Sequence, residues 1–446
     1  MADLHATIIG GGLAGSEAAF QLASRGVGVT LYEMRPYKNT PAHTTGRLAE
    51  LVCSNSLGAN SASSPAGILK QELRMLGSLV IECADRAKIP AGKALAVDRD
   101  IFSTFVTDAI ETNGNIKIIR EEATEIPRGA SIIAAGPLMS GKIAEAAGEI
   151  TGARLSFFDA AAPIVTLESV DMSQAYCADR YGVGGGDYVN CPMDRERYEA
   201  FRGALVTAER AVANKYDERA RYFEGCLPIE VMAERGMDTM RFGPMRPVGL
   251  ADPATGREPY AVVQLRRDNA EGTLYNMVGF QTNLKWPEQD RVFRMIPALE
   301  NAEFARRGVM HRNSFVCAPA VLDGYLRPAC GGIALRPDLF LAGQITGVEG
   351  YVESTAMGLA AALYMHSVLL GRELPEFPTA TAIGSLLRYL KEAEPSTFQP
   401  MNTNLGIFPK LKFSAKKLSK PERCAVYAER SRNDMEEFMY NILGRF

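Results

Sequence analysis

The beginning of the chain shows the clearest alternation between apolar and polar segments. Residues 6–9 (Ala-Thr-Ile-Ile) are a short apolar run of the kind that forms a buried strand. Ala14, Ala18 and Leu22 follow at the spacing of one helical face, and residues 29–32 (Val-Thr-Leu-Tyr) are a second apolar run. Strand, helix and strand in this order predict a βαβ unit with two parallel strands.

Two further strand-like runs stand far from this unit. Residues 131–137 (Ser-Ile-Ile-Ala-Ala-Gly-Pro) and 339–344 (Leu-Phe-Leu-Ala-Gly-Gln) both end in small residues. Strand and helix patterns alternate up to about residue 163, and turn-punctuated apolar stretches suggestive of strands follow. The longest apolar stretch, residues 358–370, is shorter than the roughly 20 residues that span a bilayer, so we expect a buried helix there.

The turn between the first strand and its helix has the composition of a phosphate-binding turn. Gly10, Gly12 and Gly15 form a GxGxxG pattern. The first glycine permits a tight turn, the second lets the backbone approach a pyrophosphate, and the third lets helix and strand pack closely. Glu33 ends the second strand, 18 positions after Gly15, where a carboxylate can accept hydrogen bonds from ribose hydroxyls. The order of these features favours dinucleotide binding over a purely structural turn.

The rest of the chain favours FAD over NAD as the dinucleotide. The runs at 131–137 and 339–344 resemble secondary segments of two-part FAD folds, although such folds often have Thr in place of Ala135 and Asp in place of Gln344. The residues expected to contact the cofactor are Gly10, Gly11, Gly12, Leu13, Ala14, Gly15, Glu33, Met34, Arg35, Gly136, Gly343, Gln344 and Tyr351.

These anchors predict an α/β fold with a Rossmann-like two-part FAD-binding domain and a long inserted α+β domain. We expect the FAD-binding domain to comprise residues 1–163 and 325–446, with a basic helical region at 380–446, and the insertion to comprise residues 164–324.

Composition places the chain among ordinary globular proteins. Of its 446 residues 47% are hydrophobic, and 49 Lys and Arg stand against 52 Asp and Glu, a net charge of −3. A strongly basic or acidic binding chain is thereby excluded as a global description. The eight cysteines include no CxxC or Cys/His cluster with zinc spacing, so we expect no metal site. Sparse cysteines without a signal peptide fit a reducing compartment, and we expect a cytoplasmic protein without a membrane segment.

Short blocks over nearly the whole length resemble one family. They include residues 33–36 (Glu-Met-Arg-Pro), 51–56 (Leu-Val-Cys-Ser-Asn-Ser), 94–99 (Ala-Leu-Ala-Val-Asp-Arg), 223–226 (Phe-Glu-Gly-Cys), 263–266 (Val-Gln-Leu-Arg), 278–282 (Val-Gly-Phe-Gln-Thr), 308–313 (Gly-Val-Met-His-Arg-Asn) and 347–351 (Gly-Val-Glu-Gly-Tyr). By these blocks the chain is similar to the folate- and FAD-dependent tRNA (uracil-5-)-methyltransferase family.

The resemblance implies a complete reaction. A one-carbon unit would pass from 5,10-methylenetetrahydrofolate to C5 of the T-loop uridine (U54) of tRNA, giving 5-methyluridine. Reduced FAD would act as reductant and methylene carrier, and NADH or NADPH would reduce it again.

Two cysteines fit this chemistry. Uracil C5 becomes nucleophilic once a group adds to C6, and a thiolate makes that addition reversibly. Cys226 precedes Pro228 and a helix predicted over residues 229–235, and Cys53 lies in a polar loop. We expect Cys226 to attack C6 and Cys53 to assist, as acid or base or by handling the flavin-bound methylene, but the roles could be exchanged. The default reading of any cysteine is a small buried hydrophobic residue.

Folate and RNA need their own contacts. His311 and Trp286 can supply stacking surfaces for folate, and Arg312 a charge for its glutamate tail. The basic segment 410–423 can contact RNA phosphates, but a solvated helix face explains it equally well. Its lysines are Lys410, Lys412, Lys416, Lys417 and Lys420, with Arg423 and one acid, Glu422. Arg241, Arg246, Arg266 and Arg267 offer a second candidate surface.

Other functions share parts of this pattern. The same chemistry could act on a ribosomal RNA uridine, because the active-site motifs do not encode the RNA. A related FAD- and folate-using enzyme of wobble uridines is longer, with a C-terminal helical region, which argues against it. A small-molecule flavin oxidoreductase would need neither the two loop cysteines nor a basic surface. The motifs leave open the preferred nicotinamide, the base that removes the C5 proton and the oligomeric state.

Overall fold

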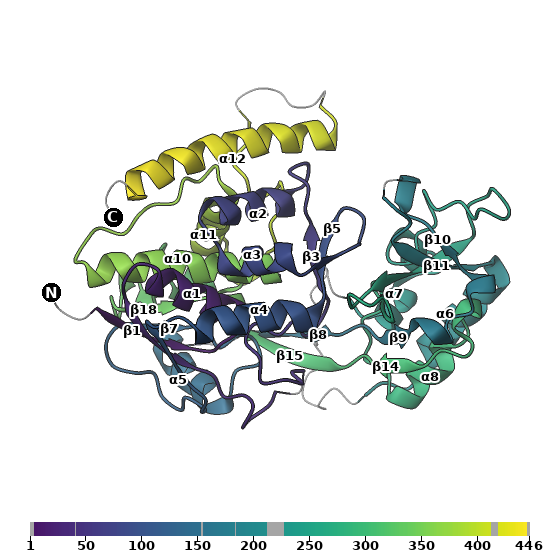
Figure 1. The fold of residues 1–446 in the computed structure, drawn as a ribbon, viewed down its shortest axis with the longest axis horizontal. Coiled ribbons are helices and arrows are strands. Elements are labelled where there is room, and N and C mark those ends of the chain that lie inside the picture. Colours follow the sequence, from purple (N-terminus) through teal and green to yellow (C-terminus); the bar gives the residue numbers. More distant parts are fainter. Residues whose placement is uncertain are drawn as a thin grey trace.

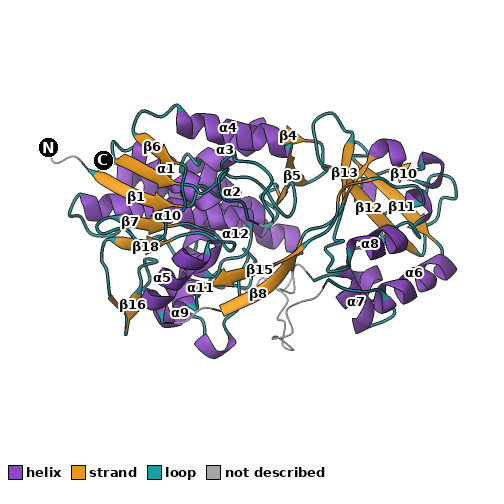
Figure 2. Ribbon diagram, turned by 90° about the horizontal axis from the view of Figure 1, so that it is seen from below, coloured by secondary structure: helices purple, strands orange, loops and turns teal. Residues whose placement is uncertain are grey.

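The computed structural model of the chain describes residues 4–40, 42–152, 155–182, 184–211, 227–411 and 418–443. For residues 155–160, 310–312 and 442–443 it describes the backbone alone. Two lobes, each with its own sheet, are joined by the paired antiparallel strands β8 (Leu155–Ala160) and β15 (Met310–Phe315), as Figures 1 and 2 show. The chain therefore passes between the lobes twice, at neighbouring positions.

The first lobe is built on a five-stranded parallel sheet. In spatial order its strands are β18 (Leu339–Leu341), β7 (Ser131–Ile133), β1 (His5–Ile9), β2 (Gly28–Tyr32) and β6 (Ile116–Ile119). The four apolar runs of the sequence analysis, at 6–9, 29–32, 131–137 and 339–344, become adjacent strands of this sheet, although β18 lies far along the chain from β7. The predicted Rossmann-like α/β fold class is confirmed.

Helices surround this sheet. Those of the first lobe are α1 (Leu13–Ala23), α2 (Pro65–Met75), α3 (Leu79–Arg86), α4 (Arg99–Glu111), α5 (Gly141–Thr151), α9 (Ala318–Val321), α10 (Tyr351–Leu369), α11 (Ala382–Glu392) and α12 (Lys420–Leu443). A Cβ on Gly358 of α10 would overlap the Ala14 carbonyl oxygen of α1, so glycine lets these two helices approach closely. The apolar stretch 358–370 is a buried helix, as predicted.

None of the helices within the described ranges is both long enough and apolar enough to cross a bilayer. The C-terminal helix α12 lies over α2 at the outside of the first lobe (Figure 1).

One buried carboxyl group ties three helices together. Glu72 of α2 accepts hydrogen bonds from the backbone amides of Ala382 and Ile383, at the start of α11, the second of them at 2.9 Å. It also accepts the hydroxyl of Ser431 in α12. Burial raises the pKa of Glu72 to about 7, although these hydrogen bonds oppose the rise. The docking of α12 is thus linked to the protonation of this group.

Smaller elements complete the first lobe. A three-stranded sheet has the order β3 (Ser56–Ala59), β5 (Ala94–Val97) and β4 (Lys88–Ile89), and β16 (Ala329–Cys330) pairs with β17 (Ile333–Ala334). Short 3-10 helices across the molecule are η1 (Leu167–Ser169), η2 (Met172–Gln174), η3 (Arg180–Gly182), η5 (Thr239–Phe242), η6 (Pro297–Leu299), η7 (Gln344–Thr346) and η8 (Pro395–Thr397).

The second lobe contains a six-stranded antiparallel sheet. In spatial order its strands are β10 (Tyr176–Cys177), β11 (Tyr188–Met193), β12 (Ala261–Arg267), β13 (Leu274–Met277), β9 (Ile164–Thr166) and β14 (Phe304–Arg306). Its helices are α6 (Arg195–Thr207), α7 (Ile229–Arg235) and α8 (Trp286–Phe293). Met193 is the last residue of β11, and the side chain of the next residue, Asp194, caps the start of α6.

The two hydrophobic cores show where the insertion ends. The core of the second lobe contains residues from Val165 to Ala302. Phe315, Val316 and Leu322 instead belong to the core of the first lobe. The chain therefore rejoins the first lobe at β15, earlier than the predicted boundary at residue 325, because the segment after β15 buries its apolar side chains there.

Candidate functional site

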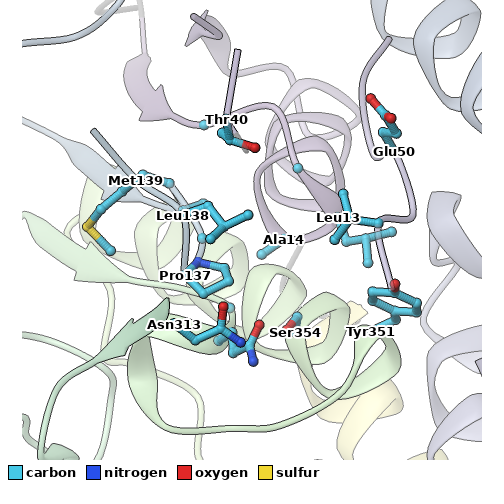
Figure 3. Close-up of a pocket in the computed structure, with 18 of the residues that line it drawn as sticks. Leu13, Ala14, Thr40, Glu50, Pro137, Leu138, Met139, Asn313, Tyr351 and Ser354 are labelled. Atoms are coloured by element: carbon cyan, nitrogen blue, oxygen red, sulfur yellow. The ribbon is translucent and has the colours of Figure 1, made fainter. Parts of the chain in front are cut away.

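A cavity of about 530 Å³ lies at the carboxyl ends of the parallel strands. Its walls come from the β1–α1 turn, the ends of β2, β7 and β18, and the first turn of α10. Figure 3 shows Leu13, Ala14, Pro137 and Tyr351 around it. In open α/β sheets ligands bind at this edge, so the cavity is the candidate site.

The glycines of the β1–α1 turn have separate physical roles. Gly10 has φ +103°, and a Cβ there would be 2.5 Å from the Ala134 carbonyl oxygen. A Cβ on Gly15 would overlap the Gly10 carbonyl oxygen, so this glycine permits the helix to pack on the turn. Gly12 has no atom within 4 Å of a Cβ and lines the cavity, which leaves its backbone open to a ligand. The turn therefore fits the diphosphate of a dinucleotide.

Glu33 is held by four hydrogen bonds at the end of β2. Its Oε1 accepts the backbone amide (3.0 Å) and Nε (2.9 Å) of Arg35, and its Oε2 accepts Arg35 Nη2 (3.1 Å) and the Gly11 amide (3.0 Å). Burial alone would raise the pKa of Glu33, but the hydrogen bonds and charge of Arg35 lower it below the usual value. The carboxylate is therefore ionised at neutral pH and joins the glycine turn to β2.

Most of the predicted cofactor residues meet at the cavity. Those that line it are Gly10, Gly12, Leu13, Ala14, Glu33, Met34, Arg35, Gly136, Gly343, Gln344 and Tyr351. Gly11 and Gly15 are not among the lining residues. Gly11 bonds to Glu33, and Gly15 packs on the turn.

Cys53 lines the same cavity, beside Tyr351 at the start of α10. The backbone amides of Cys53 and Ser54 both donate to Tyr351 Oη, at 2.8 and 3.1 Å. Burial raises the pKa of Tyr351, and the nearby Cys53 adds to the rise. The phenol is therefore neutral at physiological pH, and its oxygen accepts both amides.

The other predicted cysteine, Cys226, lies outside the described residues. The helix expected after it is α7, and Pro228 directly precedes this helix.

The predicted folate residues lie on two elements. His311 and Arg312 belong to β15, of which the structure describes the backbone at these positions, and their neighbour Asn313 lines the cavity. Trp286 begins α8, is 59% exposed and is not a lining residue of the cavity. The Arg307 guanidinium lies 5.9 Å from the centre of its ring. β15 thus runs to the cavity, whereas Trp286 is at the surface of the second lobe.

Of the predicted RNA-binding lysines, Lys410 and Lys420 are exposed, the latter at the first position of α12. Lys412, Lys416 and Lys417 lie outside the described residues.

The prediction that Arg266 belongs to a second RNA-binding surface was wrong. This side chain is buried, with 7% of the residue exposed, and it bonds to Ser54 and Asn55 beside Cys53. Sequence reasoning missed its place in the site. A charged residue within the apolar run of β12 was the available signal.

In the part of the chain that the structure describes, no group of three His, Cys, Asp or Glu side chains could hold a metal ion.

The chain has close relatives along its whole length. The family model described as "GIDA: Glucose inhibited division protein A" matches residues 5–373. The protein of Listeria monocytogenes named methylenetetrahydrofolate--tRNA-(uracil-5-)-methyltransferase TrmFO is 54% identical over 431 residues, which cover 96% of this chain and 98% of that protein. The protein of the same name from Moorella thermoacetica is 56% identical over 95% of this chain and 96% of its own. The chain belongs to the TrmFO family. The GIDA model, which matches most of the chain, also includes it.

Solved structures agree with this assignment at the level of the fold. GidA of Aquifex aeolicus superposes with a TM-score of 0.68 in one crystal form and 0.66 in another. The match covers 99% of this chain and 78% or 76% of GidA, at 16% and 17% identity. At such identity the likeness shows that the two proteins share a fold.

Proposed function

We propose that this TrmFO-family protein methylates C5 of the T-loop uridine (U54) of tRNA, with 5,10-methylenetetrahydrofolate as one-carbon donor and FAD as bound cofactor. The observation that carries the proposal is its identity of more than half to relatives with that name, over nearly the full length of both chains. The cavity supports it, because the dinucleotide turn and Cys53 line one continuous space.

The site supports FAD as the bound dinucleotide. Gly12 leaves its backbone open to a diphosphate, and Gly136 and Gly343 line the wall formed by the ends of β7 and β18. The methylene group of the donor is at the oxidation level of formaldehyde, so a methyl product requires two electrons, which bound FAD would supply in its reduced form. We propose NADH or NADPH as the external source of these electrons.

The two cysteines would make uracil C5 reactive. The thiolate of Cys226 would form an S–C6 bond and move the electron pair of the C5=C6 bond into an enolate, so that C5 becomes nucleophilic. C5 would then take the one-carbon unit as the bond between that carbon and the donor nitrogen breaks. Loss of the C5 proton, addition of the two electrons to the methylene group and departure of the sulfur as thiolate would give the methyl group and restore the double bond. Cys53, held at the cavity through Tyr351, would serve as the acid or base for proton transfer at this site.

Contacts to folate and to tRNA complete the proposal. His311 and Trp286 would stack on folate, and Arg312 would bind its carboxylates. Lys410, Lys412, Lys416, Lys417 and Lys420 would contact tRNA phosphates. We propose that the protein works in the cytoplasm.

A reconstituted reaction tests the proposed function. The FAD-loaded protein is incubated with unmodified tRNA, methylenetetrahydrofolate and NADH or NADPH, and nucleosides are analysed by mass spectrometry. We expect 5-methyluridine at one T-loop position, and none when folate or the nicotinamide is omitted. If 5-methyluridine formed in a parallel reaction with ribosomal RNA but not in the reaction with tRNA, ribosomal RNA would be the substrate. Nicotinamide oxidation without 5-methyluridine in either RNA would favour a small-molecule oxidoreductase.

The assignment of the cysteines has its own test. 5-Fluorouridine cannot lose the fluorine at C5, so the sulfur cannot leave C6. A tRNA that contains this nucleotide should therefore stay attached to the protein through the S–C6 bond as a covalent complex. We expect the complex with the wild-type protein and with Cys53→Ala, and no complex with Cys226→Ala. The reverse result would exchange the two roles.

A further inference from the structure

The loop that carries Cys53 is also the place where the second lobe contacts the candidate site. Residues 51–55 are here called the Cys53 loop. Two arginines, Arg99 of the first lobe and Arg266 of the second, donate hydrogen bonds to it. The dinucleotide turn and the proposed chemistry do not account for these buried charges.

Arg266 joins two side chains of the Cys53 loop. Its Nε donates to Asn55 Oδ1 at 3.0 Å, and its Nη2 donates to Ser54 Oγ at 2.8 Å. Asn55 is fully buried, and its amide nitrogen donates to the carbonyl oxygens of Val97 (3.1 Å) and Arg267 (2.9 Å). These bonds fix the orientation of the Asn55 amide and attach it to β12 of the second lobe.

A second contact holds the beginning of the loop. Arg99 Nη1 donates to the Leu51 carbonyl oxygen at 2.7 Å. Its Nε and Nη2 both bond to Asp268, the residue that follows β12, at 3.1 Å. Since Asp268 belongs to the second lobe, that lobe orients the guanidinium that holds Leu51.

Ser54 connects these contacts to the cavity. Its hydroxyl oxygen accepts from Arg266, while its amide donates to Tyr351 Oη next to the Cys53 amide. The loop is therefore held between the second lobe on one side and the start of α10 on the other. Release of either side would free the backbone that positions the Cys53 thiol.

We propose that Arg266 is a positioning residue for Cys53. It holds Ser54 and Asn55 to the second lobe so that the Cys53 and Ser54 amides remain on Tyr351. An arginine suits this task because its planar guanidinium presents Nε and Nη2 in a fixed geometry to two acceptors, whereas the single ammonium nitrogen of a lysine cannot occupy both positions. Within the described part of the chain no carboxylate lies at ion-pair distance from Arg266, although the charge of Asp268 acts on it from further away, and its partners in the loop are neutral groups. Such burial of a charge is unfavourable for folding, which is consistent with a role at the site.

The catalytic part of this inference rests on the proposed function, but its geometric part does not. Hydrogen exchange of the FAD-loaded protein, followed by mass spectrometry of a peptide that covers residues 51–56, tests the geometry. In Arg266→Met the exchange of this peptide should accelerate by about tenfold or more, the effect of losing a hydrogen bond to a charged donor. Tyr351→Phe, which removes the acceptor of both amides, sets the value for full release.

Arg267→Met is the matched control. It removes the same charge one residue further along β12, where the side chain lies against Gly272 of its own hairpin. Exchange in the Cys53 loop should stay at the wild-type rate, because the bond from Asn55 goes to the Arg267 backbone. Arg266→Lys should resemble Arg266→Met. A wild-type exchange rate in Arg266→Lys would contradict the proposal that the loop is held by the two donors of the guanidinium.

Two further results decide between positioning and general stability. Faster exchange to the same extent in α1 and β18 would show that Arg266 supports the fold as a whole and would overturn the proposal. The milder Ser54→Ala, which removes one acceptor, should accelerate the loop alone. In the methylation assay Arg266→Met should lower kcat with KM for tRNA and folate unchanged. If the protein forms no 5-methyluridine but the exchange results hold, the proposed function fails and the positioning of Cys53 stands.

Discussion

The carboxyl group of Glu72 should make the docking of the C-terminal helix depend on pH. Its oxygens accept the first amides of α11 and the Ser431 hydroxyl of α12, and the side chain is almost fully buried. Desolvation disfavours the charged form, so the pKa rises from 4.5 to about 7 in the folded protein. When α12 and α11 separate from α2, the group returns to water and to its ordinary pKa.

The sign and size of the effect follow from this shift. The folded state binds the proton more tightly than the opened state does, so the stabilisation is complete below pH 4.5 and is lost as the pH rises through about 7. One pKa unit corresponds to about 1.4 kcal/mol, which makes the total change about 3 kcal/mol. The equilibrium constant for opening of α12 should therefore rise roughly 50- to 100-fold between pH 5 and pH 8.

Hydrogen exchange of α12 measures this opening, after correction for the intrinsic pH dependence of amide exchange. Glu72→Gln cannot titrate, so the opening constant of α12 should become nearly independent of pH in this variant. Glu82→Gln, at an exposed position of α3, is the control and should keep the wild-type pH dependence. If wild-type α12 and the Glu72→Gln variant respond identically to pH, or if α12 becomes more protected as pH rises, the reasoning about Glu72 is refuted.

Four other predictions concern the site and its surface. Gly15→Ala should destabilise the fold by about 3 kcal/mol or more in urea unfolding, because its Cβ overlaps backbone. Gly12→Ala should change the free energy of unfolding by less than about 1 kcal/mol but weaken FAD binding about tenfold or more, because the methyl group enters the cavity. Unchanged FAD affinity would contradict the proposal that the diphosphate lies against Gly12. Glu33→Gln leaves a buried guanidinium without its nearest charge and should cost about 3 kcal/mol at pH 7, a difference that shrinks below pH 4.5 as the wild-type carboxylate is protonated. Neutralising Lys410 and Lys420 together should reduce the slope of log affinity for tRNA against log salt by about 1 to 2, and an unaltered slope would remove both from the interface.

Features that depend on local sequence could be predicted. The glycine turn, the first helix and the strand that ends at Glu33 follow from neighbouring residues, and the structure has them at the expected positions. The strand runs at 131–137 and 339–344 also proved to belong to the same sheet, where the run at 131–137 pairs with the first strand and the run at 339–344 pairs with that at 131–137. The partners of Glu33 were not foreseen, because they depend on how the chain turns at Arg35.

Contacts between distant segments were beyond the sequence patterns. Arg266 and Asn55 are 211 positions apart, and their bond depends on how the second lobe packs on the first. An arginine near the end of a strand is usually exposed, so the pattern favoured a surface role. The end of the insertion was misplaced for the same reason, since the burial of Phe315 and Leu322 in the first lobe is a tertiary contact.

The late position of β18 and α10 has a consequence for folding during synthesis. The first lobe cannot complete its sheet, or cover α1 with α10, until the chain has been made beyond the whole second lobe. The core of the second lobe, in contrast, comes from one continuous stretch between Val165 and Ala302. We therefore expect the second lobe to fold first on the ribosome, while the N-terminal strands wait for partners that are still to be translated.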